Sequence, residues 1–256
     1  MRAAAESITG RRENNEDAYR SRDDLGLFLV ADGMGGHEGG EVASRVAVDT
    51  LVGFFERMAP HGASAGRASS AELAGERIEL ATRMAHAEVS RLAKGPLEDM
   101  GTTLVALWRL DVEQALVAHL GDSRVYRLRG SELVRLTRDH SFLAELDAAG
   151  AGSLAGQLPG AFSAMVTRCI SARMDATPEV ALVEVRAGDT FLLCTDGLTD
   201  VVDDDDIAAV LLASASAADA AQELIDVAYA AGSVDNITAL VVDAARVVRS
   251  EEHTSG

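Results

Sequence analysis

Four aspartates stand at the ends of apolar segments whose composition is typical of buried strands. Asp32, Asp122 and Asp196 each follow such a segment, and Asp235 comes just before one. If these strand ends converge, the carboxylates repel one another strongly, so each must hold a proton or share a cation. A pair of divalent ions about 3.5–4 Å apart, bridged by a carboxylate and a water, satisfies the cluster. Such a pair can generate a hydroxide nucleophile and neutralise a phosphate.

Asp32 lies in the stretch most typical of a chemical site. It follows the apolar run 25–30, and five glycines come within the next eight residues: Gly33, Gly35, Gly36, Gly39 and Gly40. Glycine allows positive φ angles and a close approach of the backbone to a bound group. A carboxylate beside exposed carbonyls suits a hard cation such as Mg²⁺ or Mn²⁺. The alternative is a tight strand-to-helix turn in which Asp32 caps the helix.

The polar segment 10–17 supplies two further candidates. Arg12 carries the planar guanidinium that grips two phosphate oxygens, and Asp17 offers another carboxylate to the water shell of a cation. Taken alone, this segment also fits a solvated charged loop, and Gly121-Asp122 fits an ordinary hairpin turn. His140 is expected to be structural rather than a ligand. The recurrence of aspartates at strand ends is what favours a metal site.

Several rival catalytic schemes lack their motifs in this sequence. The sequence contains no Walker phosphate-binding loop, no Cys-x-x-Cys pair and no His-Glu-x-x-His pair. The expected ligands are therefore oxygen atoms, and the expected metal is hard.

Charge and composition argue against several classes of partner. The chain has 256 residues, with 23 Lys and Arg against 41 Asp and Glu, which gives a formal net charge of −18. Nucleic acids and anionic membranes both require basic surface, so neither is expected as a partner. Cys169 and Cys194 cannot form a disulfide framework and are expected to be reduced, which fits the cytoplasm. No export signal or spanning segment is expected.

Hydrophobic periodicity predicts one domain over residues 1–245, followed by a polar tail at 246–256. The two longest helices are expected to lie side by side and antiparallel. The segment 150–164 is rich in glycine and small residues and is predicted to be a surface loop or flap. Expected strands are 4–9, 25–30, 102–110, 115–120, 123–128, 133–136, 189–195 and 237–242, and expected helices are 41–58, 71–94, 142–149, 207–213 and 217–231.

Taken together, these motifs resemble those of the metal-dependent protein phosphatases of type 2C, the PPM family, in their bacterial single-domain form. The resemblance is collinear and runs from about residue 9 to residue 243. Seven motifs carry it: Arg12-x-x-Asn15-Glu16-Asp17, Ala31-Asp32-Gly33-Met34-Gly35-Gly36-His37, Met100-Gly101-Thr102-Thr103, Gly121-Asp122-Ser123-Arg124, Thr137-x-Asp139-His140-Ser141, Cys194-Thr195-Asp196-Gly197-Leu198 and Asp235-Asn236-Ile237-Thr238.

The resemblance implies an α+β fold, a four-layer αββα sandwich in which two antiparallel β-sheets are flanked by pairs of antiparallel helices. It implies a protein serine/threonine phosphatase in which a water or hydroxide bridging two Mn²⁺ or Mg²⁺ ions attacks phosphoserine or phosphothreonine, without a phosphoenzyme. The implied partners are phosphorylated proteins, among them a bacterial Ser/Thr kinase and its substrates. A monomer is expected.

By position in these motifs, Asp32 would bridge two metal ions, Gly33 would lend its carbonyl, and Asp196 and Asp235 would complete the pair. Asp122, with Asp196, matches the third metal site of bacterial members.

The remaining positions of the motifs carry over as well. Asp17 would act through water, and Arg12 corresponds to the arginine that grips phosphate. Animal members carry a histidine directly after Asp-Gly as the proposed general acid, whereas this chain has Met34, as bacterial relatives usually do. His37 or a metal-bound water is then the candidate proton donor. The flap, at about 143–173, lacks the glutamate-rich, His-Pro pattern of the family, so substrate preference can differ.

Two alternative functions stay open at the level of sequence. A catalytically silent module could keep the fold and bind a kinase or regulator, although such relatives usually lose metal carboxylates that this chain retains. A phosphatase acting on a small phosphorylated metabolite is the other alternative.

Overall fold

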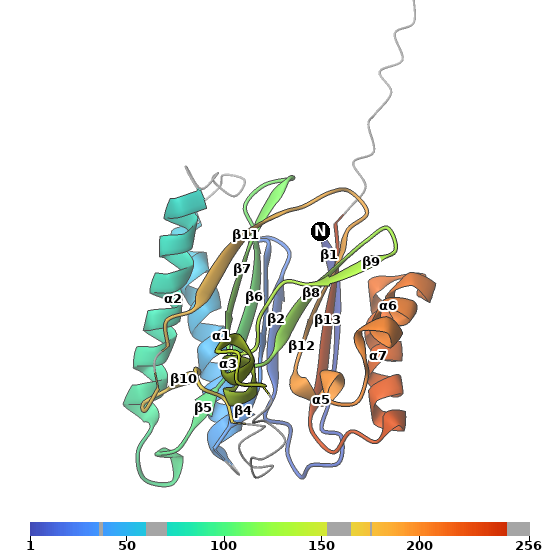
Figure 1. Ribbon diagram of the computed structural model, residues 1–256. Coiled ribbons are helices and arrows are strands. Elements are labelled where there is room, and N and C mark those ends of the chain that lie inside the picture. Colours follow the sequence, from blue (N-terminus) through green and yellow to red (C-terminus); the bar gives the residue numbers. More distant parts are fainter. Residues whose placement is uncertain (36–37, 60–70, 153–164, 175, 245–256) are drawn as a thin grey trace, which may run out of the picture.

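The structure, a computed structural model, describes residues 1–35, 38–59, 71–152, 165–174 and 176–244. Two five-stranded sheets, with every strand pair antiparallel, lie face to face between two layers of helices (Figure 1). This arrangement confirms the predicted four-layer αββα sandwich. His37, the middle of the flap and the polar tail 246–256 lie outside the described residues.

The first sheet has the strand order β11-β7-β6-β3-β2 and packs against the antiparallel pair α1 and α2. Strand β3 is buried on both faces, as its continuous apolar run predicts: Leu27 and Leu29 face the helices, and Phe28 and Val30 face the other sheet. The elements are β2 (Ala18–Arg22), β3 (Leu27–Ala31), β6 (Leu104–Arg109), β7 (Gln114–Leu120), β11 (Glu179–Glu184), α1 (Glu38–Met58) and α2 (Ala71–Leu92).

The second sheet has the order β1-β13-β12-β8-β9 and packs against α6 and α7. Side chains of Asp203 and Ser216 cap the two helices, and Gly232, with φ of 98°, ends α7 in the left-handed conformation. The elements are β1 (Arg2–Ile8), β8 (Arg124–Arg129), β9 (Glu132–Arg135), β12 (Thr190–Cys194), β13 (Ile237–Asp243), α5 (Asp196–Thr199), α6 (Asp204–Ala213) and α7 (Ala217–Ala231).

A third, small sheet corrects the prediction at one end of the sandwich. The expected strand 102–110 is broken at Thr103, whose backbone N–H turns to the carbonyl of Asp32 instead of continuing a ladder. Two-residue strands have no periodicity that a sequence can reveal. The pieces in this region are β4 (Gly33–Met34), β5 (Gly101–Thr102), β10 (Ile170–Ser171), the 3₁₀ turn η1 (Gly95–Leu97) and α3 (Phe142–Ala148).

Two strands of the large sheets, β2 and β11, escaped prediction; they form the two edges of the first sheet, and neither contains a fully buried residue. The other large elements are confirmed, with ends shifted by a few residues.

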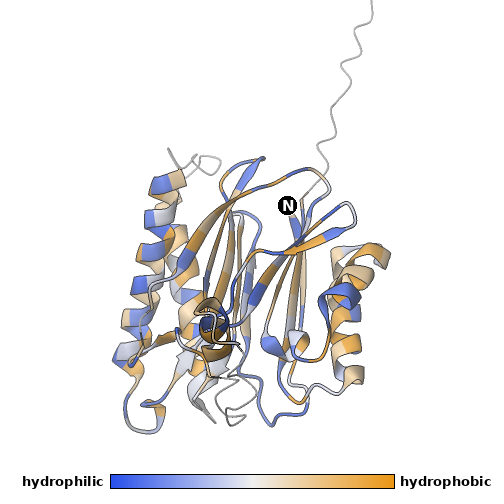
Figure 2. Cartoon of the chain, viewed as in Figure 1, coloured by the Kyte–Doolittle hydropathy of each residue, from blue (hydrophilic) through white to orange (hydrophobic). Residues whose placement is uncertain are grey.

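Three apolar layers make up the core, one beneath each helix pair and one between the sheets. Figure 2 shows many hydrophobic residues in the strands of both large sheets. Asp32, Asp122, Asp196 and Asp235 lie just outside these strands, at their ends. Cys169 and Cys194 are buried and free, as expected. Within the described ranges, no helix is both long and apolar enough to cross a membrane.

Candidate metal centre

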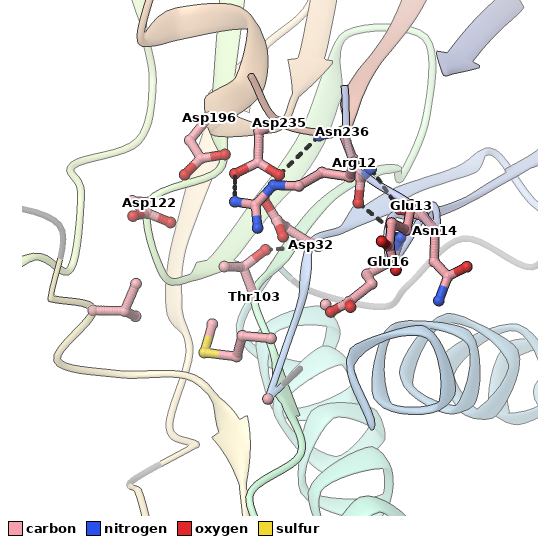
Figure 3. A pocket seen from close by; sticks show the side chains of 14 residues that line it. Arg12, Glu13, Asn14, Glu16, Asp32, Thr103, Asp122, Asp196, Asp235 and Asn236 are labelled. Carbon is pink, nitrogen blue, oxygen red and sulfur yellow. Dashed lines mark hydrogen bonds and ion pairs between the residues drawn. The ribbon is translucent and has the colours of Figure 1, made fainter. Parts of the chain in front are cut away.

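A pocket at one end of the sandwich brings together the four aspartates that the sequence singled out (Figure 3). Asp32, Asp122, Asp196 and Asp235 all line it, together with Arg12. They come from the end of β3, the β7–β8 turn, the start of α5 and the residues just before β13. Because the strands are antiparallel, β3, β7 and β12 end where β13 begins. The fold therefore gathers side chains that lie up to about 200 residues apart in the chain.

The glycine that follows each of two aspartates permits close backbone approach. A Cβ at Gly33 would lie 2.2 Å from the carbonyl oxygen of Gly40, and a Cβ at Gly197 would lie 1.9 Å from that of Asn236. Any larger residue would push these segments apart. The two Asp-Gly pairs are thus required to bring Asp32 and Asp196 into the same pocket.

Backbone hydrogen bonds fix Asp32 from the neighbouring strand. Its N–H donates to the Thr103 hydroxyl at 2.9 Å, and its carbonyl accepts from the Thr103 N–H at 2.9 Å and from the Thr102 hydroxyl at 2.8 Å. Helix α1 begins only at Glu38. The alternative in which Asp32 caps that helix is therefore wrong, and its carboxylate is left for the pocket.

Asp17 lies behind the pocket and is held by two hydroxyls. Its Oδ2 accepts from Thr238 at 2.6 Å and from Thr195 at 3.0 Å, while its Oδ1 is buried and has no hydrogen-bonding partner among the described residues. Sequence reasoning did not assign these two threonines a role. Thr195 directly precedes Asp196, and Thr238 is the third residue after Asp235. This closeness to the aspartates is the one signal in the sequence that could have drawn attention to them.

Asn236 ties the loop of Arg12 to the start of β13. Its amide donates to the carbonyls of Thr9 and Asn14, both at 2.8 Å, and its side-chain oxygen accepts from the Glu16 N–H at 2.8 Å. This residue too was missed as a contributor to the site. It holds the loop so that the Arg12 side chain reaches the pocket.

Arg12 itself is partly exposed and paired with one of the four aspartates. Its Nη2 lies 2.6 Å from Oδ2 of Asp235, and the two side chains are 57% and 37% exposed. An exposed pair of this kind is weak and easily rearranged. Among the described residues that line the pocket, Arg12 is the one with a basic side chain. A single positive charge cannot neutralise four carboxylates.

Asp17, Asp32 and Asp122 resist ionisation because each is buried close to other carboxylates. Burial, followed by the charges of Asp17 and Asp196, raises the pKa of Asp32 well above its ordinary value. Burial raises the pKa of Asp122 to about 7, with a further contribution from Asp196. Burial also raises the pKa of Asp17 to about 7 despite its two hydroxyl donors. The cluster therefore favours added positive charge.

The donor set fits a hard divalent cation. It consists of carboxylate oxygens, and Oδ1 of Asp196, like Oδ1 of Asp17, is buried without a hydrogen-bonding partner within the described part of the chain. Such orphaned anionic oxygens are ligands that Mg²⁺ and Mn²⁺ prefer. Gly33 and Met34 line the same pocket, whereas His37 falls outside the described residues.

The sequence of residues 6–229 matches the family described as protein phosphatase 2C. The chain belongs to the protein phosphatase 2C family. A serine/threonine phosphatase Stp of Listeria welshimeri is 33% identical over 253 residues, which cover 95% of this chain and 96% of that protein. The phosphatase PstP of Mycobacterium tuberculosis is 35% identical over 245 residues, covering 95% of this chain and 45% of PstP.

A solved relative in the protein phosphatase 2C family carries metal. The crystal structure of the catalytic domain of PstP in complex with two manganese ions superposes with a TM-score of 0.79 at 32% identity, covering 94% of this chain and 97% of that one. The expected family, fold and metal dependence are thereby confirmed. As a protein phosphatase 2C member, the chain is a phosphoric monoester hydrolase that acts on phosphorylated proteins, and a catalytically silent module is not supported.

Proposed function

We propose that this chain removes phosphate from phosphoserine and phosphothreonine in proteins, using Mn²⁺ or Mg²⁺ held by Asp32, Asp196, Asp235 and the Gly33 carbonyl. The observation that carries the proposal is one pocket lined by four aspartates and a single arginine within the described residues. When bound, the two ions supply charge neutralisation for the phosphate and acidify water for attack at phosphorus. Of the ligands, Asp32 is the one assigned to bridge both ions.

The remaining residues act on the ligands and on the phosphate. Asp122, together with Asp196, is assigned to a third ion, and Asp17 acts through water. Arg12 leaves Asp235 to bind two phosphate oxygens, which its exposed side chain permits. His37, or a water of the metal centre, donates the proton to the leaving serine or threonine oxygen.

The cellular role is proposed from the named relatives. Stp and PstP are bacterial serine/threonine phosphatases, and this chain is assigned the same reaction, opposing a Ser/Thr kinase in the cytoplasm. It acts as a monomer, with residues 1–245 forming one catalytic domain and 246–256 a tail. Removal of phosphate from an autophosphorylated Ser/Thr kinase by the purified chain, with no other phosphatase added, tests whether such a kinase is a substrate.

Hydrolysis of a phosphothreonine peptide and of para-nitrophenyl phosphate with added MnCl₂ tests the reaction. Asp196→Asn should lower kcat at least about 100-fold, since loss of a direct ligand should cost at least as much as loss of its supporting contacts. Asp205→Asn removes an exposed acid on α6 and is the matched control. An inactive wild type, or an Asp196→Asn variant as active as wild type, contradicts the proposal.

Competition separates protein substrates from metabolites. The phosphothreonine peptide should be hydrolysed in preference to sugar phosphates and nucleotides supplied at equal concentration. Preference for a small phosphorylated metabolite would overturn the assignment of the substrate.

A further inference from the structure

The carboxylate of Glu179 faces three basic side chains at the edge of the first sheet. Glu179 begins β11, and its register partner on β7 is His119. Its Oε1 lies 3.3 Å from Nε2 of His140 and 3.4 Å from Nη1 of Arg168, and its Oε2 lies 3.9 Å from Nε2 of His119. The two histidine side chains are each 6% exposed, whereas Glu179 is 49% exposed. An accessible acid thus covers a buried histidine pair.

His140 connects Glu179 to the turn that carries Asp122. The backbone N–H of His140 donates to the Gly121 carbonyl at 2.9 Å, and the Gly121 N–H donates to Nδ1 of the imidazole at 3.2 Å. Because Nδ1 accepts a hydrogen bond, this bond assigns the proton of the neutral ring to Nε2, the atom that faces Glu179. Both polar backbone groups of Gly121 therefore depend on the position of His140.

The same residue anchors the base of the flap. The carbonyl of His140 accepts from the Thr167 N–H at 2.8 Å, and the Phe142 N–H donates to the Met165 carbonyl at 2.9 Å. Arg168, which faces Glu179, directly follows this ladder. Glu179 therefore contacts one side of the flap base through His140 and the other through Arg168.

The histidine pair is poorly arranged to chelate a metal of its own. Ligand atoms of His119, His140 and Glu179 lie within 4.8 Å of one another. However, the two rings are stacked, with centroids 4.5 Å apart and planes inclined by 15°. Ring nitrogens bind metals along lone pairs that lie in the ring plane, so nearly parallel rings do not converge on one ion. Nε2 of His119 is also engaged at 2.8 Å by the Arg138 carbonyl.

We propose that Glu179 is a positioning residue for the metal centre, which clamps His140 and, through it, the Gly121-Asp122 turn against the edge of the sheet. Without the clamp, His140 has no acidic partner for Nε2, and the turn loses rigidity on the side that carries Asp122. This inference rests on the proposed role of Asp122 as a metal ligand. Its effect should fall on the ion that Asp122 binds rather than on the pair held by Asp32.

The test compares two variants of Glu179 with a control on the same strand. Glu179→Leu removes the acid, Glu179→Gln keeps a polar side chain of the same shape opposite Nε2 of His140, and Glu184→Leu removes the acid at the far end of β11. Calorimetric titration of the metal-free protein with MnCl₂ should show the weakest site about threefold to tenfold weaker in Glu179→Leu, at or just below the lower end of supporting-contact effects. Glu179→Gln should lie between this variant and wild type.

Kinetics provide the second measurement. In Glu179→Leu the Mn²⁺ concentration for half-maximal activity should rise by the same factor. The value of kcat at saturating Mn²⁺ should stay within about twofold of wild type, because Glu179 affects how tightly the metal binds and not the reaction itself. Equal Mn²⁺ titrations for Glu179→Leu and Glu184→Leu, with wild type active, overturn the clamp alone. A wild-type protein that neither binds Mn²⁺ nor hydrolyses the phosphothreonine peptide overturns the proposed function as well.

Discussion

Strand β12 has an aspartate just before it and another just after it, and the two lie in opposite environments. Asp189, at the first end, is 1% exposed and is bound through both oxygens by the Arg129 guanidinium, with each contact at 2.8 Å. Asp196, at the other end, shares a pocket with three more aspartates and the single guanidinium of Arg12. The buried acid that serves the fold has its own cation, whereas the four acids of the pocket outnumber the one cation that the described residues supply.

The pKa values of Asp189 and Asp196 shift in opposite directions, in line with this difference. Burial alone would raise the pKa of Asp189, but hydrogen bonds from Arg129 and from the Arg186 N–H bring it below its ordinary value. At the other end, burial raises the pKa of Asp196 to about 6, with the charge of Asp200 adding to the effect. Strand β12 therefore has at one end Asp189, whose charge is balanced by Arg129, and at the other end Asp196, for which no basic partner is found among the described residues.

The largest effect is expected from Asp32→Asn. Because Asp32 is the proposed bridging ligand, kcat with saturating Mn²⁺ should fall at least about 100-fold. The metal-free protein should become more stable, since one of the mutually repelling carboxylates is gone. Steady-state kinetics and thermal melts in EDTA measure the two effects. A variant that loses activity and also melts earlier in EDTA would show that Asp32 stabilises the fold.

Asp189→Asn should have the reverse pattern. It removes the partner of Arg129, which is 23% exposed, so the free energy of unfolding should fall by about 2–3 kcal/mol, less than for a fully buried pair. Mn²⁺ affinity and kcat should equal those of wild type below the melting temperature. Urea unfolding and Mn²⁺ titration check this prediction, and a change in Mn²⁺ affinity would break the contrast between the two ends.

Stability of the metal-free protein should depend on pH through the pocket. A carboxyl whose pKa is raised on folding, such as Asp122 at about 7, stabilises the fold when protonated, and this contribution is lost as pH rises from about 4 through 7. Melting in EDTA should therefore occur roughly 5–10 °C lower at pH 8 than at pH 5.

Two comparisons assign this pH effect to the pocket. Saturating Mn²⁺ should remove most of the difference, since a ligand that binds only the folded state stabilises it. Asp122→Asn should melt with a smaller pH difference than wild type, although both carry the same remaining surface charge. Identical pH profiles for the two proteins would assign the effect to the net charge of the chain.

The smallest effect on Mn²⁺ binding is expected from removing one of the hydroxyl groups that donate hydrogen bonds to Asp17. Thr238→Val removes a 2.6 Å hydrogen bond to Asp17 with little change of shape. Mn²⁺ affinity at pH 7 should fall about threefold to tenfold, the equivalent of roughly one ordinary hydrogen bond. Thr190→Val, which loses the bond to Asp243 at the Asp189 end of β12, is the matched control and should leave Mn²⁺ affinity unchanged.

Sequence revealed one part of the centre and hid another for definable reasons. Asp32 and Asp196 could be found because each interrupts an apolar run and is followed by glycine, a local pattern. Thr195 and Thr238 could not, because a single hydroxyl carries no periodic signal and their shared partner Asp17 lies 178 and 221 residues away. Long-range hydrogen bonds leave no trace in local composition.

The fold was predictable to a similar extent. Strands β3, β12 and β13 were found because burial on both faces produces continuous apolar runs. Strand β11 was not, because four of its six residues are exposed and it begins with Glu179 directly after a proline. The residues that clamp the Asp122 turn therefore come from the part of the chain whose structure was hardest to anticipate.

The bonds from Asn236 to Thr9 and Asn14 also bear on when the protein can first work. They join segments separated by 227 and 222 residues, and the same joint brings Arg12 to Asp235. A nascent chain whose strand β13 is still inside the ribosome has Arg12 but lacks the segment on which Arg12 docks. With the roles proposed for Arg12 and Asp235, dephosphorylation has to wait until synthesis has passed β13, so a half-made copy does not act on a phosphoprotein.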